Sequence, residues 1–145
     1  MKKISFYLLG MVVMLLTACT ASNVAFTEAR NYFHRNDAQL PSDLKLQITS
    51  VEEFERHFDR AAVMGKDGEP TPIDFSKSFV IAKVLPVTSL KTELRPLKLK
   101  KKGNRLDLGY KFKQGEKQSY ATQPMFILIV DRKYMNYPIS ESVYN

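Results

Sequence analysis

The stretch that decides the fold is Ser78-Phe79-Val80-Ile81-Ala82-Lys83-Val84-Leu85. From Phe79 onward it is apolar at odd and even positions alike except at Lys83, and a strand with two apolar faces is typical of the middle of a sheet that is covered on both sides. A second apolar run, Met125–Val130, predicts another buried strand. These two runs predict the best-defined strands of the sheet.

One helix is predicted before the first of these strands. Leu44–Ile48 alternates between apolar and polar residues, which is the period of a half-buried strand. Ser50 and Glu53 then have the spacing of a capping box, in which a hydroxyl and a carboxylate satisfy reciprocal backbone N–H groups. One face of the helix that follows is apolar and consists of Val51, Phe54, Phe58 and Ala61 or Ala62.

The remaining segments predict strands and loops. Leu90–Lys100 and Arg105–Lys113 alternate on either side of a Gly-Asn turn and predict a hairpin, with an edge position or a bulge at Pro96, which lacks an N–H donor. Val63–Asp74 is rich in glycine and proline and predicts a long loop. Further elements are a loop at Asn36–Ser42, a strand at Ala29–His34 and a tail at Tyr134–Tyr144 with a short strand. We therefore expect an α+β fold, a single antiparallel sheet of about five strands with one helix packed on a face.

The first residues have the composition of an export signal. Lys2 and Lys3 precede an uncharged apolar run, Ile4–Leu16. As a helix this run would cover about two thirds of a bilayer core of roughly 30 Å, which favours a cleaved signal peptide over a transmembrane helix. Leu16-Thr17-Ala18-Cys19 resembles the bacterial lipobox, in which the cysteine accepts the lipid. An ordinary secretory signal is the alternative.

The lipobox resemblance implies a domain organisation and a location. Residues 1–18 would be a lipoprotein signal peptide, residues 19–23 a tether and residues 24–145 a single globular domain. Lipidation of Cys19 would anchor the protein in the cell envelope. By resemblance to the sorting rules of bacterial lipoproteins, Thr20 rather than Asp after the cysteine favours the outer membrane. Both faces of that membrane remain alternatives. Because Cys19 is the only cysteine, the domain forms no internal disulfide.

The charge of the chain is moderately basic. The precursor carries a formal net charge of +7, and removal of Lys2 and Lys3 leaves 20 basic against 15 acidic residues. The densest basic run, residues 98–102, is either a solvated hairpin whose lysines prevent edge pairing or a surface for anionic lipid. We expect no nucleic-acid partner.

The sequence contains no recognisable catalytic or metal-binding motif. His34 and His57 are the only histidines, and neither belongs to an HExxH or HxH spacing. No serine lies in a GxSxG motif, and Asp67, Glu69 and Asp74 lack the alternating ligands of a calcium loop. We expect no cofactor, no metal and no enzymatic activity, with a small hydrolase or a ligand carrier as the remaining alternative.

One segment predicts a binding surface. Gln114–Pro124 is polar, lies between two predicted strands and carries one aromatic residue, and loops on rigid sheets often carry recognition. The alternative is an ordinary connection with Tyr120 packed onto the sheet. The candidate surface consists of Lys111, Lys113, Lys117, Gln118, Tyr120 and Gln123.

Several segments occur in an order found in a known family, namely Ser50–Phe58, Asp74–Lys77, Phe79–Ala82, Gln118–Tyr120 with Pro124, and Phe126–Val130. This order resembles the PrcB-type domain, which is also found in small lipoproteins of Bacteroidetes-like bacteria. The resemblance implies a lipoprotein or exported domain and a partner-binding role, because the namesake associates with and stabilises a surface protease complex. The chain departs from the family at Val87–Lys91, where a glycine-rich turn is usual, and no functional residue is carried over.

These observations lead to one functional prediction and its alternatives. We expect a membrane-anchored, non-enzymatic envelope lipoprotein that binds another protein, for example as an accessory subunit of a protease complex. An exported protease inhibitor acting through Val63–Ile73 and Gln114–Pro124 is the alternative. The oligomeric state is not specified by any sequence pattern.

Overall fold

The computed structural model describes residues 20–35, 43–61 and 64–145. The predicted signal peptide, Cys19 and the predicted loop Asn36–Ser42 lie outside the described residues. The helical elements are α2 (Val51–His57) and the 3-10 turn η2 (Arg132–Tyr134). The strands are β1 (Ser22–Asn23), β2 (Phe26–Glu28), β3 (Tyr32–His34), β4 (Leu44–Ile48), β5 (Phe58–Arg60), β6 (Ser78–Val84), β7 (Thr88–Lys102), β8 (Arg105–Thr122), β9 (Met125–Asp131) and β10 (Ile139–Tyr144).

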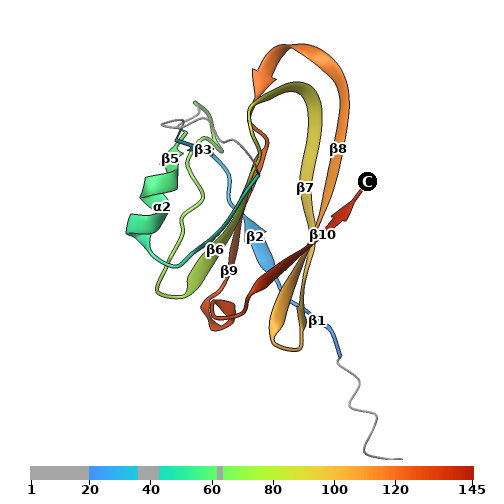
Figure 1. Ribbon diagram of the computed structural model, residues 1–145. Coiled ribbons are helices and arrows are strands. Elements are labelled where there is room, and N and C mark those ends of the chain that lie inside the picture. The colour runs from blue at the N-terminus through green and yellow to red at the C-terminus, as the bar shows by residue number, and fades with distance from the viewer. Residues whose placement is uncertain (1–19, 36–42, 62–63) are drawn as a thin grey trace, which may run out of the picture.

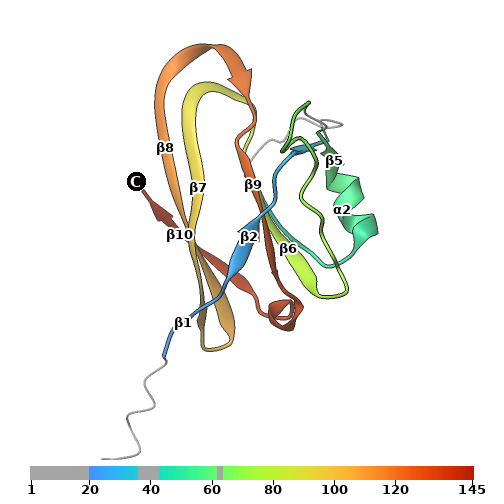
Figure 2. The same cartoon turned by 180° about the vertical axis from the view of Figure 1, so that it is seen from behind.

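The strands form three sheets rather than one. Two four-stranded sheets have the orders β1-β7-β8-β10 and β2-β9-β6-β4, and β3 pairs with β5. All pairs are antiparallel except β10, which runs parallel to β8. Figures 1 and 2 show the two larger sheets as separate layers, with α2 beyond β6 on the side away from β7 and β8. The predicted single five-stranded sheet with one helix was wrong.

The reason for this difference is how the two apolar strands are covered. One face of β6, with Phe79 and Ile81, shares a core with Leu106 and Leu108 of β8. The opposite face packs on the α2 layer through a second core, formed by Ile48, Phe54, Phe58, Val80, Ala82, Val84 and Ile127. The sequence showed that both faces of β6 and β9 need cover, but the hairpin was predicted to extend their sheet and instead lies on top of it.

The hairpin is confirmed, and it is longer than predicted. Gly103 has a φ of 59° in its turn, a conformation that favours glycine. The register shifts at Pro96, which confirms the predicted bulge, and again nearer the open end of the hairpin. β8 takes twelve residue steps from Tyr110 to Thr122 against eight for β7 from Pro96 to Thr88. Bulges bend a strand, so β8 arches outside β7 in Figure 1. The predicted loop Gln114–Pro124 is therefore mostly strand.

The helix begins as predicted and ends earlier. The Ser50 hydroxyl accepts a hydrogen bond from the Glu53 N–H at 3.2 Å, and the Glu53 carboxylate accepts one from the N–H of Thr49, one residue before the expected donor. The predicted continuation to Ala61 or Ala62 was wrong, because Phe58 leaves the helix in an extended conformation and pairs with His34. The predicted strand Ala29–His34 is likewise reduced to β3.

The C-terminal strand β10 is fixed by polar contacts as well as by its ladder. Asp107, which is buried, accepts hydrogen bonds from Lys102 at 2.7 Å and Ser142 at 2.8 Å. Lys83, also buried, lies 3.1 Å from the Glu141 carboxylate. Both cores and these contacts lie within residues 24–142. In the described part of the chain, no helix has the length and apolar character needed to cross a bilayer.

Candidate functional site: a groove beside α2

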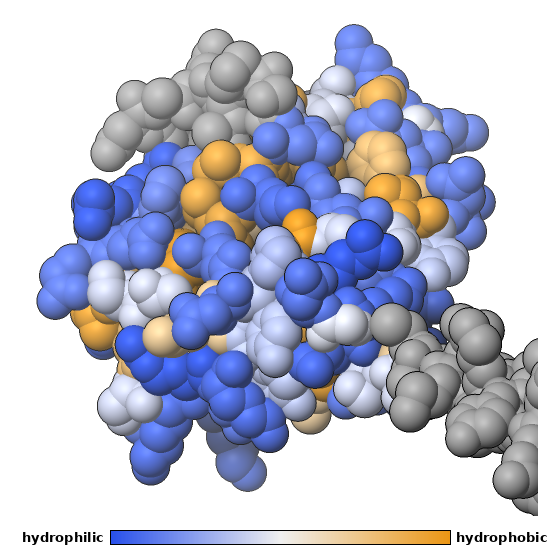
Figure 3. Space-filling view, turned by 60° about the horizontal axis from the view of Figure 1, so that its bottom comes forward, coloured by the Kyte–Doolittle hydropathy of each residue, from blue (hydrophilic) through white to orange (hydrophobic). Residues whose placement is uncertain are grey.

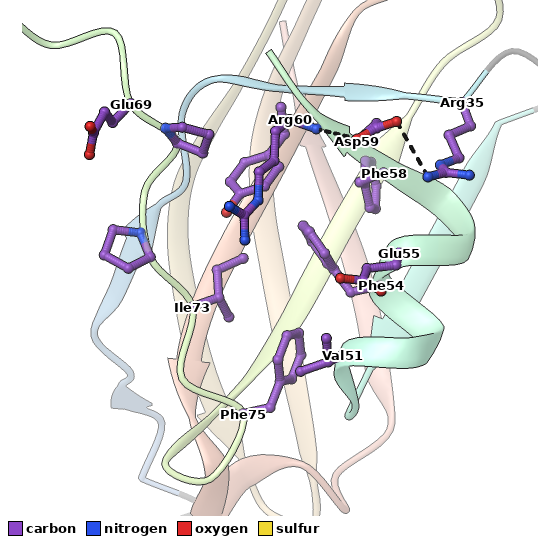
Figure 4. A pocket seen from close by; sticks show the side chains of 13 residues that line it. Arg35, Val51, Phe54, Glu55, Phe58, Asp59, Arg60, Glu69, Ile73 and Phe75 are labelled. Carbon is purple, nitrogen blue, oxygen red and sulfur yellow. Dashed lines mark hydrogen bonds and ion pairs between the residues drawn. The ribbon is translucent and has the colours of Figure 1, made fainter. Parts of the chain in front are cut away.

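A groove with a volume of about 790 Å³ lies between α2 and the segment of residues 69–75. Figure 4 shows the helix with Phe54 and Glu55 on one side and the segment with Glu69 and Ile73 on the other. Pockets of roughly 300–1,000 Å³ are typical of ligand sites. The space therefore has the size of a binding site for a small molecule or for part of an extended peptide.

The floor of the groove is aromatic. Phe54 is 6% exposed and touches three other rings, with Tyr32 edge-on at a centroid distance of 5.2 Å, Phe58 at 5.1 Å and Phe75 at 5.9 Å. Edge-on and tilted contacts at these distances favour fixed ring positions. At one end Val51 is 46% exposed. The floor therefore offers an apolar surface whose shape is set before any ligand binds.

The wall opposite the helix is held by hydrogen bonds to residues distant in the sequence. Asn31, with a φ of 63°, donates from its side chain to the carbonyls of Asp67 at 2.8 Å and Glu69 at 2.9 Å. The Tyr32 hydroxyl donates to the Thr71 carbonyl at 2.7 Å. The Thr71 hydroxyl accepts from the N–H of Arg30 at 2.9 Å. These bonds, with the restricted backbone of Pro70 and Pro72, make this wall a fixed part of the fold.

Charged groups lie at the rim and at the centre. Arg35 and Asp59 form an ion pair at 3.3 Å at one end. In Figure 4 the Arg60 side chain extends from β5 toward Ile73, and it makes no ion pair with any described residue. Burial raises the pKa of the Tyr32 phenol, an effect that the positive charge of Arg60 partly offsets. The groove thus combines an apolar floor with a cation available for an anionic group.

His34, His57 and Asp74 do not come together as a reactive centre within the described part of the chain. No group of three His, Asp or Glu side chains within that part of the chain is placed to hold a metal ion. The rings of His34 and His57 lie 6.3 Å apart, outside the groove lining. A hydrogen bond from the Ser76 hydroxyl lowers the pKa of the Asp74 carboxyl, which forms part of an exposed turn.

The predicted binding surface lies along β8, and none of its residues lines the groove. Lys111 and Lys113 stand opposite Arg95 and Glu93, and Lys111 lies 3.2 Å from the Glu93 carboxylate. Lys117 stands opposite Leu90. Because side chains alternate along β7, Leu90 and Lys117 lie on the face of the hairpin opposite to Glu93 and Lys113.

The remaining members of that surface lie closer to the end of β8. Gln118 donates to the hydroxyl of Tyr120 at 2.7 Å, and Tyr120 is 57% exposed rather than packed onto the sheet. Gln123 is half-buried between β8 and β9. The six residues are therefore distributed over both faces of one strand and its end.

Sequence reasoning missed the groove, although part of its signal was present. The apolar helix face at Val51, Phe54 and Phe58 predicts only packing on the sheet, and the loop with Pro70 and Pro72 is predicted to act only in the protease-inhibitor alternative. Tyr32 gave no local signal, because it reaches the site through contacts with residues about forty positions away.

Comparison with protein-family models, curated proteins and solved structures found no match for this chain. The resemblance to the PrcB-type domain, the lipoprotein assignment and the protease-inhibitor alternative all stay predictions.

Proposed function

We propose that this chain is a lipid-anchored envelope protein without enzymatic activity, which binds a partner protein through the groove beside α2. The observation that carries the proposal is the groove itself, with an aromatic floor, a wall fixed by long-range hydrogen bonds and Arg60 at its centre. Preformed surfaces lose little conformational entropy on binding. Aromatic and arginine side chains are also the commonest energetic anchors of protein interfaces.

The proposed occupant is an extended peptide segment that carries an apolar side chain next to a carboxylate. The apolar side chain would lie against Phe54 and Phe75, and the carboxylate would pair with Arg60. Bidentate pairing with a carboxylate is the interaction that a guanidinium favours most. Glu55 and Glu69 also line the groove, so a second carboxylate close to them is disfavoured.

The anchor is proposed from the lipobox resemblance at Leu16–Cys19 and the apolar run before it. Several acyl chains at about 0.8 kcal/mol per buried methylene would hold the protein on a membrane. The partner is therefore another protein of the envelope. A protease complex is one such partner, in line with the family resemblance.

The proposal is tested by crosslinking the full chain in native envelopes and identifying captured proteins by mass spectrometry. Arg60→Glu reverses the charge at the centre of the groove and should abolish capture of the main partner. Arg56→Glu is the matched control, because Arg56 is an exposed residue of α2 that does not line the groove. Equal capture by both variants would place the interface elsewhere. Failure of the unmodified chain to capture any specific protein would refute a protein-binding role.

A further inference from the structure

The first described residues lie beside the basic turn of the β7–β8 hairpin. Ser22 pairs with Lys101 and Asn23 with Lys100 in antiparallel register. Followed backwards from Ser22, the chain therefore runs toward the tip of the turn. Figures 1 and 2 show β1 at the same end of the molecule as this turn.

This end of the hairpin has a concentrated positive charge. Residues 98–109 contain five basic side chains and one carboxylate, that of Asp107, which is occupied by Lys102 at 2.7 Å. Lys98 lies over the Tyr144 ring at 4.4 Å and Lys101 over the Tyr137 ring at 5.1 Å. Lys100 and Arg105 form no ion pair within the described residues. Hydrophilic side chains cover most of this end, which Figure 3 brings forward.

Protection of an open sheet edge does not account for all of these lysines. Edge strands often carry lysine to prevent pairing with another chain. At Lys100 and Lys101, however, the edge of β7 is already covered by β1. The positive charge at these positions is therefore available for another purpose.

The spacing to the proposed anchor is short. Cys19 precedes Ser22 by three residues, and an extended chain spans at most about 3.6 Å per residue, so the two Cα atoms lie within about 11 Å of each other. Electrostatic attraction to a charged membrane acts over a Debye length of about 8 Å at physiological salt. A lipid on Cys19 would thus bring the basic turn into the range of the lipid headgroups.

We propose that the basic end of the β7–β8 hairpin binds anionic lipid headgroups next to the anchor and so fixes the orientation of the domain on the membrane. This inference rests on the lipidation of Cys19 in the proposed function. A single lipid tether leaves a domain free to rotate, whereas a second contact beside it limits that rotation. The groove lies on the outer face of the other sheet, in the layer farthest from β7 and β8.

The test uses the full lipidated chain reconstituted into vesicles of phosphatidylcholine with or without phosphatidylglycerol. Asn104→Cys, at the exposed tip of the turn, carries a fluorophore, and lipids with a headgroup quencher report contact. We expect strong quenching with phosphatidylglycerol and weak quenching without it. Quenching that is independent of phosphatidylglycerol would overturn the proposal, because contact would then follow from the tether alone.

Charge variants distinguish an effect of the basic turn from an effect of the net charge of the protein. Each basic residue at an anionic surface contributes about 1 kcal/mol, so Lys100→Gln with Arg105→Gln should lower the contact equilibrium constant about thirtyfold. Lys113→Gln with Lys117→Gln removes the same charge from the other end of the hairpin and should change it less than about threefold. Equal losses in the two double variants would overturn the proposal.

Flotation of the same preparation distinguishes failure of the anchor from failure of the contact. Protein that floats with both vesicles but shows no selective quenching retains the anchor and refutes the contact. Protein that floats with neither type refutes the anchor. In that case the unanchored chain must still bind phosphatidylglycerol vesicles at low salt for the contact to stand, and absence of such binding would refute it as well.

Discussion

The two faces of the β6–β9 layer differ in how completely they are covered. On one face, the long strands β7 and β8 close a core in which Leu106 and Leu108 are fully buried. On the other face, the short helix α2 and the segment of residues 69–75 cover the layer only in part and leave a groove of about 790 Å³. Two long strands can cover the whole face of a sheet, whereas a two-turn helix covers only part of it and leaves the rest to a second element. The difference explains why the candidate site lies on the helical side.

The sharpest test of this comparison is truncation on the closed face. Leu108→Ala should lower the free energy of unfolding by about 2–5 kcal/mol, because the cavity it leaves is surrounded by packed side chains. Val51→Ala, on the rim of the groove, should change it by less than about 0.5 kcal/mol. Denaturant titration measures both. Similar losses in the two variants would show that the groove is closed in solution.

A smaller effect is expected at the start of the helix that forms one groove wall. Ser50→Ala removes the cap on the Glu53 N–H and should cost about 1 kcal/mol of stability. Ser50→Asp keeps an acceptor at this position and serves as the control, because it should retain most of the stability. Loss of stability in both variants would mean that the side chain acts in some way other than capping.

The opposite groove wall, formed by residues 69–75, is tested at Tyr32, whose hydroxyl is bonded to it. Tyr32→Phe keeps the ring against Phe54 but removes the hydrogen bond to Thr71, which should cost about 0.5–1.5 kcal/mol. Amide exchange at Glu69, Thr71 and Ile73 should become faster. Tyr120→Phe is the matched control, because the Tyr120 hydroxyl accepts a surface hydrogen bond from the Gln118 side chain and its loss should have little effect. Unchanged exchange in Tyr32→Phe would show that the wall does not depend on this bond.

The smallest expected effect is a pH dependence on the closed side. The hydrogen bond from Lys102, followed by those from the serines of β10, lowers the pKa of the Asp107 carboxyl below its ordinary value of 3.8. A carboxyl group whose pKa is lower in the folded protein than in the unfolded chain stabilises the fold. This stabilisation is present above the pKa of the unfolded chain and is lost as the pH falls through the pKa of the folded protein. The stability difference between the unmodified chain and Asp107→Asn should therefore shrink as the pH falls below about 4. A constant difference across acidic pH would contradict this assignment.

Much of the local structure could be predicted from short-range patterns. The apolar runs at β6 and β9, the alternation at β4, the Gly103 turn and the bulge at Pro96 all depend on neighbouring residues. The end of α2 could not be predicted, because Phe58 continues the apolar periodicity of the helix while its backbone pairs with β3. Phe58 fits both a helix and a strand, and its pairing with His34 of β3 selects the strand.

The candidate site was less predictable than the fold. Of the six residues predicted as a binding surface, five lie on β8 and Gln123 follows it, and those on the strand do not share a face. The register shift between Leu90 and Thr92 changes which side chains are neighbours. The groove is assembled from β3, α2, β5 and residues 69–75, which are joined by hydrogen bonds across about forty residues. Such contacts leave no periodic signal in the sequence.

The sequence by itself determined the elements whose cause is local. These are the two strands with apolar faces, the capped start of the helix and the basic hairpin, and the export signal is a prediction of the same kind. Only the tertiary structure decided that the hairpin lies over the β6–β9 layer and that Arg60 lies between two walls above an aromatic floor. The physical reason is that burial requires a strand face to be covered but does not specify which distant segment covers it.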